Sequence, residues 1–239
     1  MNAAMYKALS GALVQMRRLE AVTQDLANVN TAGYKGERLV FREVLESPPK
    51  PHERIGGQAV VTEQRTDFSN GALRSTGNPF DLALMGDGFF SVQTPAGERY
   101  TRQGAFSLSV NNTLVTPSGE ALLGESGPIR IDGKKVDITE TGAVLVDGEE
   151  VDRLKIMRAE DPRRLVREGS TFFRAEEANL QAADEAQVVQ GSLEDANVNP
   201  IEAMVSLIDI QRQFEAYERA IRTMDSVTEK VVTEAGRLS

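Results

Sequence analysis

Apolar side chains recur at alternating steps of three and four residues near the start of the chain. Residues 2–27 contain neither proline nor an alternation of period two, and the recurring positions are Leu9, Ala12, Met16, Leu19, Thr23 and Leu26. This spacing predicts a helix with a narrow apolar seam of the kind found in coiled coils. Gly33, which follows the Asn28–Thr31 stretch, is expected to adopt a positive φ and to stop the chain from continuing as helix.

The same spacing returns at the far end and persists for more than four heptads. Asn199 is a good N-cap, Pro200 suits the first helical position, and Glu202 lies where a capping-box acid belongs. The apolar positions are Leu207, Ile210, Phe214, Tyr217, Ile221, Met224, Thr228, Val231, Ala235 and Leu238. A helix over residues 200–238 would be roughly 58 Å long. Such a narrow stripe predicts partners along its whole length.

The middle of the chain has the pattern of β structure. Two Asp-Gly pairs, Asp132-Gly133 and Asp147-Gly148, lie between short apolar runs, and each predicts a hairpin turn. Further short strands are expected at residues 89–92, 100–102, 105–108 and 114–116. Residues 36–75 differ, because they hold Pro48-Pro49-Lys50-Pro51, Gly56-Gly57 and few apolar clusters. They predict an extended segment rather than a folded domain.

The order of elements predicts an α+β protein in which the terminal helices form one coiled-coil domain and an all-β domain is inserted between them. The expected divisions are 1–34 for the first helix, 35–75 for an extended, hairpin-like linker, 76–196 for the β domain and 197–239 for the last helix. The alternative is two ordinary amphipathic helices packed on the β domain. The predicted assembly seam consists of Leu9, Met16, Leu19, Leu26, Leu207, Ile210, Phe214, Tyr217, Ile221, Met224, Val231 and Leu238.

Composition narrows the classes of function. Lys and Arg total 27 against 36 Asp and Glu, so the formal charge of −9 disfavours binding to nucleic acid or to an anionic membrane surface. The absence of cysteine removes disulfides, thiolate zinc sites and cysteine nucleophiles. The sequence contains no run of 18 apolar residues, so it predicts no membrane-spanning helix. The apolar stretch at residues 8–16 imitates a signal peptide, but two arginines follow it and no cleavage site does, so a helix is the preferred interpretation.

Few residues suggest chemistry. His52, the only histidine, lies in the proline-rich excursion and is expected to be solvated. Gly86-Asp87-Gly88 lacks the third glycine of a dinucleotide loop and predicts a tight turn that lets Phe89 and Phe90 enter the core. Asn111-Asn112-Thr113 is a formal glycosylation sequon but is better explained as a turn. We therefore expect no catalytic, cofactor-binding or metal site.

Four motifs, in order, resemble the flagellar rod and hook protein family. The first is Gln24–Lys35, with Asn28, Asn30 and Gly33; the second is Thr76–Leu84, with Asp81, followed by Gly86, Gly88, Phe89 and Phe90; the third runs from Asp161-Pro162 to Phe173; the fourth is Asn197-Val198-Asn199-Pro200 with residues up to Glu215. Together they span nearly the whole chain, and within the family the proximal-rod members are the most similar. The distal-rod members are very similar in the same motifs.

This resemblance implies a non-enzymatic building block of the periplasmic rod. It implies export through the flagellar type III apparatus and helical assembly into a drive shaft that encloses the export channel, with the terminal helices on the inside and the β domain outside. Partners would be further copies of the chain, other rod proteins including the distal-rod protein, and the export apparatus. No cofactor and no membrane insertion are implied.

The sequence alone leaves two alternative functions open, an enzyme and a ligand-binding module. Asp67, Asp81 and Asp87 could supply the carboxylate pair of a periplasmic glycan-acting enzyme. Alternatively, a coiled-coil module could display the β domain to a ligand. A pocket or glycan cleavage would favour these readings, and polymer formation would favour the shaft.

Overall fold

The computed structural model describes residues 2–44, 58–175, 180–183 and 185–237, which form two compact units. Unit 1 comprises Met1–Ala27, Glu37–Arg65 and Asn199–Ser239. Unit 2 comprises Asn28–Gly36 and Thr66–Val198. The proline-rich stretch and His52 lie outside the described residues.

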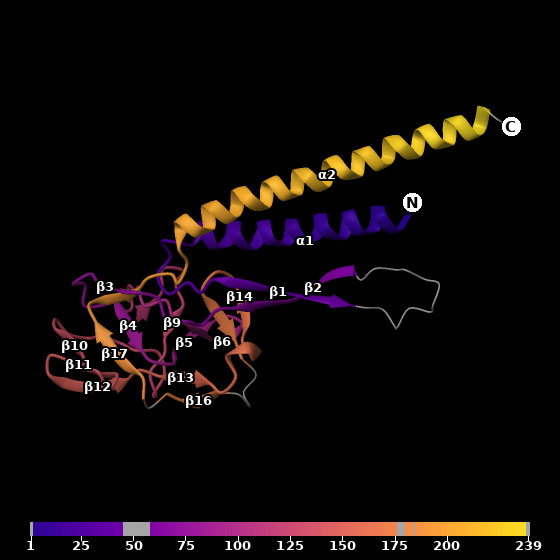
Figure 1. Ribbon diagram of the computed structural model, residues 1–239. Coiled ribbons are helices and arrows are strands. Elements are labelled where there is room, and N and C mark those ends of the chain that lie inside the picture. Colours follow the sequence, from indigo (N-terminus) through magenta and orange to yellow (C-terminus); the bar gives the residue numbers. More distant parts are fainter. Residues whose placement is uncertain (1, 45–57, 176–179, 184, 238–239) are drawn as a thin grey trace. The chain divides into compact units, whose positions relative to one another are not determined.

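Unit 1 contains two long helices and a two-stranded sheet. Helix α1 spans Asn2–Ala27 and helix α2 spans Pro200–Arg237. They lie side by side and antiparallel, so that the two chain ends are at the same end of the unit (Figure 1). The extended segments β1 (Glu37–Val44) and β2 (Gln58–Thr66) pair with each other.

The start of α2 is capped as the sequence predicts. The Asn199 side-chain oxygen accepts a hydrogen bond from the Ile201 N–H at 3.0 Å, and Pro200 occupies the first helical position. The amide of Asn199 thereby satisfies one of the N–H groups that a helix start leaves without a partner, and proline has no N–H to satisfy there.

The α+β class agrees with the structure, but the predicted coiled-coil domain is wrong. Of the described part of the chain, only α1 and α2 are α-helices, and most of the rest of the fold is β-sheet. Buried Ala8 and Ala12 are too small to act as interlocking knobs, whereas Leu9 and Met16 of the predicted seam are 49% and 40% exposed. With 38 residues against 26, α2 also extends past α1 (Figure 1).

Unit 2 is built from short antiparallel strands. Its largest sheet has the order β14-β15-β6-β5-β9-β8-β7, with β13 pairing with both β5 and β16, and smaller sheets are β10-β11-β12, β17-β4 and β18-β3. The bounds of the strands are β3 (Leu73–Ser75), β4 (Leu82–Met85), β5 (Phe89–Thr94), β6 (Gly97–Thr101), β7 (Ser107–Leu108), β8 (Leu114–Val115), β9 (Ala121–Leu122), β10 (Val136–Ile138), β11 (Ala143–Val146), β12 (Glu149–Arg153), β13 (Ile156–Ala159), β14 (Val166–Glu168), β15 (Phe172–Arg174), β16 (Leu180–Ala182), β17 (Gln187–Gln190) and β18 (Ser192–Glu194). One 3₁₀ turn, η1, spans Pro162–Arg164.

The core of unit 2 has two parts. The larger surrounds Phe90 and Phe106, whose rings meet edge to face at 5.5 Å. The smaller surrounds Phe89 and Phe173, and Phe68 packs edge to face against both rings. Successive side chains of a strand point to opposite faces, so Phe89 and Phe90 are buried on the two faces of β5. The pair Phe89-Phe90 after a glycine turn predicts this burial.

Only one of the two predicted Asp-Gly hairpins forms. Asp147 and Gly148 have φ of 52° and 95° and join β11 to β12, as a tight hairpin turn requires. The prediction at Asp132-Gly133 is wrong. Ile129 and Ile131 donate to Leu122 and Asn112 instead of pairing with β10, because these residues close the edge of the main core.

Candidate functional site

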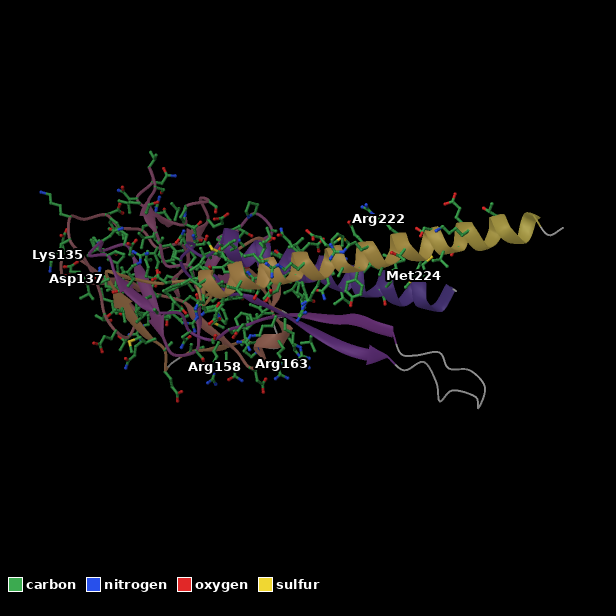
Figure 2. All side chains as sticks on the ribbon, turned by 45° about the horizontal axis from the view of Figure 1, so that its top comes forward. Lys135, Asp137, Arg158, Arg163, Arg222 and Met224 are labelled. Carbon is green, nitrogen blue, oxygen red and sulfur yellow. The ribbon has the colours of Figure 1, made fainter. Side chains whose placement is uncertain are left out.

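The face of α2 that turns toward α1 carries an apolar stripe. Its buried or half-buried members recur at steps of four and three residues: Ala203, Leu207, Ile210, Phe214, Tyr217, Ile221 and Met224. Figure 2 shows Met224 on the side of α2 nearer α1, whereas Arg222 points away. The spacing predicted from the sequence therefore matches this inner face of α2 as far as Met224. Thr228 is exposed, the side chain of Val231 is not described, and Leu238 lies outside the described residues.

At Gly11 the backbone of α1 lies directly against a side chain of α2. A Cβ built there would lie 2.6 Å from two carbons of the Tyr217 ring, so no larger residue fits beside that ring in this position. A glycine within a helix costs roughly 1 kcal/mol relative to alanine. The close packing of the Tyr217 ring on bare backbone gives this glycine a structural reason.

The inner face of α1 differs from the predicted seam. Among the α1 side chains that are described, those of Ala8, Ala12, Gln15 and Ala21 are buried, and the Gln15 side-chain oxygen has no hydrogen-bond partner. Leu19 and Leu26 of the predicted seam are half-buried, but Leu9 and Met16 are exposed. Because the predicted positions of α1 straddle two faces, only some of them turn toward α2.

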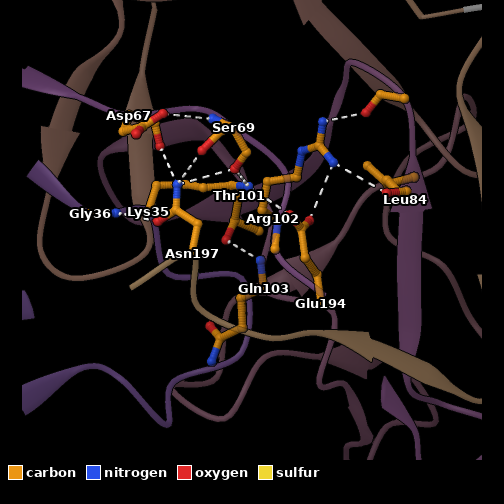
Figure 3. A network of polar contacts seen from close by, with 12 residues as sticks. Lys35, Gly36, Asp67, Ser69, Leu84, Thr101, Arg102, Gln103, Glu194 and Asn197 are labelled. Carbon is orange, nitrogen blue, oxygen red and sulfur yellow. Dashed lines mark hydrogen bonds and ion pairs between the residues drawn. The ribbon is translucent and has the colours of Figure 1, made fainter. Parts of the chain in front are cut away.

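In unit 2, the segment after the first turn is held by a buried network of polar contacts (Figure 3). The Lys35 ammonium donates to the Glu194 carboxylate at 2.6 Å and to the Ser69 carbonyl at 2.7 Å. Arg102 donates to the other oxygen of Glu194 at 3.3 Å and to the Gly86 carbonyl at 2.6 Å. One carboxylate therefore joins two cations from distant parts of the chain.

Burial makes this network sensitive to the loss of any member. The side chains of Lys35 and Glu194 are both 1% exposed and that of Arg102 is 3% exposed. Burial lowers the pKa of Lys35, and the nearby Glu194 carboxylate opposes that shift. The pKa of Arg102 is lowered by burial in the same way, again opposed by Glu194. Glu194 thus compensates the charge of both buried cations.

Asn197 joins the same region from the C-terminal motif. Its side-chain oxygen accepts from the Gly36 N–H at 2.7 Å, and its amide donates to the Asp67 carbonyl at 2.8 Å. The N-terminal turn, the segment around Asp67 and the segment before α2 are therefore cross-linked by one side chain. This contact explains chemically why asparagine, with a donor and an acceptor, suits this position.

Gly33 has the positive φ that the sequence predicts, at +67°. A Cβ there would lie 2.2 Å from the carbonyl carbon and oxygen of Arg102, and the Gly33 N–H donates to the Glu194 backbone carbonyl at 2.7 Å. Its role therefore goes beyond ending α1, because it lets the chain pass directly over the backbone beside Arg102. The backbone carbonyl of Asn28 supports the same turn by accepting from the Thr31 N–H at 2.9 Å, and Asn30 is exposed.

The second motif forms a turn. Asp81 accepts from the Thr76 hydroxyl at 2.6 Å and from the Asn78 amide at 2.9 Å. Gly86 has a φ of +93°, and a Cβ at Gly88 would lie 3.0 Å from Ile156. The prediction of a tight turn before Phe89 is confirmed, since that ring and its neighbour are buried.

Asp67, Asp81 and Asp87 do not form one site. Asp81 is held by its own turn, and Asp67 accepts from the Ser69 N–H at 3.0 Å. Asp87 lines a groove of about 450 Å³ that neither of the others lines. Within the described residues, no group of acidic or histidine side chains is arranged to hold a metal ion. No described helix is long and apolar enough to span a bilayer.

Glu194 is the member of the network that sequence reasoning missed. Gly33 and Lys35 belong to the first motif and Arg102 to a predicted strand, but Glu194 is one of two adjacent acids just before the C-terminal motif and belongs to no predicted feature. The available signal was that a lysine in a motif of otherwise structural residues needs a carboxylate if it is buried.

Comparison with known proteins decides the family. Residues 83–146 match the model "Flagellar hook protein FlgE/F/G D1 domain", and residues 189–234 match "Flagellar basal body rod FlgEFG protein C-terminal". The rod protein FlgF of Caulobacter vibrioides is 34% identical over 238 residues, which cover 96% of this chain and 95% of the relative. The chain belongs to the flagellar basal-body rod protein family.

Other relatives agree with this membership. FlgF of Salmonella typhimurium is 31% identical, with 94% of this chain and 95% of the relative covered. FlgG of Borreliella burgdorferi is 30% identical, with 95% of this chain and 96% of the relative covered. The resemblance predicted from the motifs is confirmed, and the chain is a structural rod protein of the flagellar basal body.

Proposed function

We propose that this rod protein is a subunit of the FlgF type that enters the rod through its terminal helices. The observation that carries this proposal is the length of α2, which extends past its partner α1. A lone chain leaves the end of α2 without a helix beside it. Neighbouring subunits around a common axis can cover it, and contacts between unlike faces propagate as a helical assembly.

The partners in this proposal are further copies of the chain and other rod proteins, including a FlgG-type distal subunit. The assembled shaft would transmit torque across the periplasm and enclose the export channel, and the subunit would reach its position through the flagellar type III export apparatus. Apolar burial contributes roughly 25 cal/mol per Å², so many modest helix contacts add up to a stiff shaft.

A FlgG-type distal subunit is the second candidate. The Borreliella burgdorferi FlgG relative supports it, because its 30% identity is close to the 31% of the Salmonella typhimurium FlgF relative. The two candidates differ in the strain that the chain restores. A FlgF-type subunit restores swimming only where FlgF is missing, and a FlgG-type subunit only where FlgG is missing.

The decisive experiment expresses the chain in its own host after deletion of its gene, and measures swimming and the presence of the chain in purified basal bodies. Phe214→Asp is expected to abolish both, because it puts a charge on the inner face of α2. Ala216→Asp places the same charge on an exposed position two residues away and should leave both unchanged.

Secreted amounts of both variants should be compared, so that failed export is not mistaken for failed assembly. Normal swimming with Phe214→Asp would overturn the role of the helices. Cleavage of purified peptidoglycan by the wild-type chain would instead support the glycan-acting alternative, for which the rod proposal expects no activity.

A further inference from the structure

Asn70 is the only asparagine of the chain that is followed by glycine. It is exposed and lies in the irregular segment between β2 and β3. Asparagine before glycine is the dipeptide most prone to deamidation in an unfolded chain, because glycine has no side chain to shield its backbone nitrogen. Asn70-Gly71 is therefore a candidate site of covalent modification in unit 2.

The fold needs glycine at position 71. A Cβ built there would lie 1.9 Å from the Asp195 carbonyl oxygen. The Asp195 N–H in turn donates to the Ala72 carbonyl at 2.8 Å, which holds the two segments together. Any side chain at Gly71 would push the segments apart, so packing fixes the glycine of the reactive pair.

Deamidation begins at the Gly71 nitrogen. After this nitrogen has lost its proton to base, it attacks Cγ of Asn70. The new C–N bond closes a succinimide ring, and the side-chain nitrogen leaves as ammonia. Water then opens the ring at either of its carbonyls. One opening gives an ordinary aspartate, and the other gives an isoaspartate, in which the main chain runs through Cγ and is longer by one carbon.

The folded chain opposes the first step of this reaction. The Gly71 N–H donates to Oε1 of Glu194 at 2.8 Å, and the same oxygen accepts from the Lys35 ammonium. The side chain of Glu194 is 1% exposed. Deprotonation of Gly71 would place a nitrogen anion against a buried carboxylate, and two like charges so close together are strongly unfavourable away from water.

The backbone on the other side of Asn70 is held as well (Figure 3). The Ser69 carbonyl accepts from the Lys35 ammonium at 2.7 Å and from the Asn197 amide at 3.1 Å. Ring closure requires the backbone to rotate between Ser69 and Gly71, so that the Gly71 nitrogen turns toward Cγ of Asn70. Both ends of that rotation are fixed by buried or half-buried partners.

We propose that Asn70 is a deamidation site whose reaction Glu194 blocks in the folded chain and which reacts while unit 2 is unfolded. This inference goes beyond the proposed function, because it concerns the lifetime of the unfolded subunit. An isoaspartate at position 70 displaces Gly71 from its place against Asp195 and from Glu194. A chain that reacts before folding therefore loses part of the network that closes unit 2.

Tryptic mapping tests the proposal directly. Cleavage after Arg65 and Arg74 releases a peptide of residues 66–74, in which Asn70 is the only asparagine. The full-length chain is incubated at mildly alkaline pH, either folded or in urea, and mass spectrometry follows the conversion of this peptide to its aspartate and isoaspartate forms. A hydrogen bond to a charged acceptor should slow the reaction of the folded chain by roughly 10- to 100-fold. Equal rates would overturn the proposal.

Hydrogen exchange identifies the cause without any substitution. Base-catalysed exchange removes the same proton from the Gly71 nitrogen. The exchange rate at Gly71 and the deamidation rate of Asn70 should therefore rise together as urea is added. If the Gly71 amide of the folded chain exchanges as fast as an unprotected amide, Glu194 does not hold that proton and the proposal is wrong.

Two variants separate the effect of Glu194 from a general loss of stability. Glu194→Gln removes the charged acceptor, whereas Ile131→Ala removes packing from the main core and leaves the contact between Gly71 and Glu194 in place. Under conditions in which circular dichroism shows equal folded fractions, Asn70 should deamidate faster in Glu194→Gln by about 10-fold. Equal rates in the two variants would assign the protection to folding in general and overturn the role of Glu194.

The consequence of the modification is tested by ageing the wild-type chain and Asn70→Gln side by side in urea and then refolding them. The two chains share every other reactive residue, and glutamine forms a ring far more slowly than asparagine. Aged Asn70→Gln should refold, whereas wild-type chains with isoaspartate at position 70 should be depleted from the folded, protease-resistant fraction. If that fraction contains isoaspartate in the same proportion as the aged mixture, the modification does not disturb unit 2 and this part of the proposal is wrong.

Discussion

The Lys35 ammonium reaches the Glu194 carboxylate at 2.6 Å, although the two residues are 159 positions apart in the chain. The contact is almost completely buried, and Glu194 also accepts from Arg102 at 3.3 Å. Removing charges from water is unfavourable, so such a group is stabilising only while all members are present. The contact therefore locks the segment after the first turn to β18 and joins the two ends of unit 2.

Replacing Glu194 tests this interpretation. In Glu194→Gln the shape is retained, but two buried cations, Lys35 and Arg102, lose their common carboxylate. We expect the free energy of unfolding to fall by about 3–5 kcal/mol, measured by urea denaturation. The neighbouring Asp195→Asn is the control, because the Arg74–Asp195 pair is exposed and should contribute less than about 1 kcal/mol. Equal effects of the two substitutions would contradict the locking role.

Gly33 gives a second test, because its positive φ and its close approach to Arg102 can be separated. Gly33→Ala must both strain the backbone and displace the Arg102 carbonyl, which lies 2.2 Å from the new Cβ. Gly119 has a φ of +100° with no atom within 4 Å of a new Cβ, so Gly119→Ala measures backbone strain alone. We expect Gly33→Ala to lower the stability of the fold by about 1–3 kcal/mol more than Gly119→Ala. Matching losses in thermal denaturation would show that the approach to Arg102 is unimportant.

The helices and their caps could be predicted from sequence because the signals are local. Asn199 and Pro200 define the start of α2 by hydrogen bonding and ring geometry that involve only the next few residues. Asp147-Gly148 was likewise sufficient for its hairpin, since both residues tolerate positive φ. At Asp132-Gly133 the same dipeptide failed, because the pairing of Ile131 with Asn112 depends on residues distant in sequence.

The sequence did not predict which face of α1 packs against α2. On α1, large residues such as Leu9 suggested the inner face, yet the helix packs through Ala8 and Ala12. Close approach of two helices favours small residues, whereas hydrophobic periodicity favours large ones. The buried pair Lys35–Glu194 was hidden for a different reason, since charge alone gives no sign of burial.

Gly11 should respond to mutation in a way that depends on Tyr217. In an ordinary helix Gly→Ala stabilises by about 1 kcal/mol, but a Cβ at Gly11 would lie 2.6 Å from the Tyr217 ring. Gly11→Ala should therefore destabilise the helix pair in the wild-type chain and stabilise it in a Tyr217→Ala background. A double-mutant cycle followed by the helical circular-dichroism signal measures this reversal of sign. Additive effects would show that the ring moves aside freely.

The last prediction concerns the segment that completes unit 2. Residues 28–36 precede the rest of the unit by about 30 positions, yet Tyr34 is fully buried and Lys35 is 1% exposed. Arg167 stacks over the Tyr34 ring at 5.0 Å from its centroid and donates to the Lys35 carbonyl, so both faces of this segment are engaged.

A fragment of residues 66–198 should consequently be less stable than the same unit in the full chain, because Glu194 loses Lys35 and the Tyr34 ring leaves its site beside Arg167. A synthetic peptide of residues 28–37 should bind this fragment and raise its melting temperature in proportion to peptide concentration, since a ligand that binds only the folded state stabilises it by mass action. A peptide with Lys35→Met supplies the same length and a similar apolar volume but leaves Glu194 with Arg102 alone, and it should bind more weakly. A peptide with Gly33→Val should bind weakly for a different reason, because its Cβ meets the Arg102 backbone 2.2 Å away. If the fragment matches the full chain in stability and none of the peptides binds, the segment is attached to unit 2 without contributing to its folding.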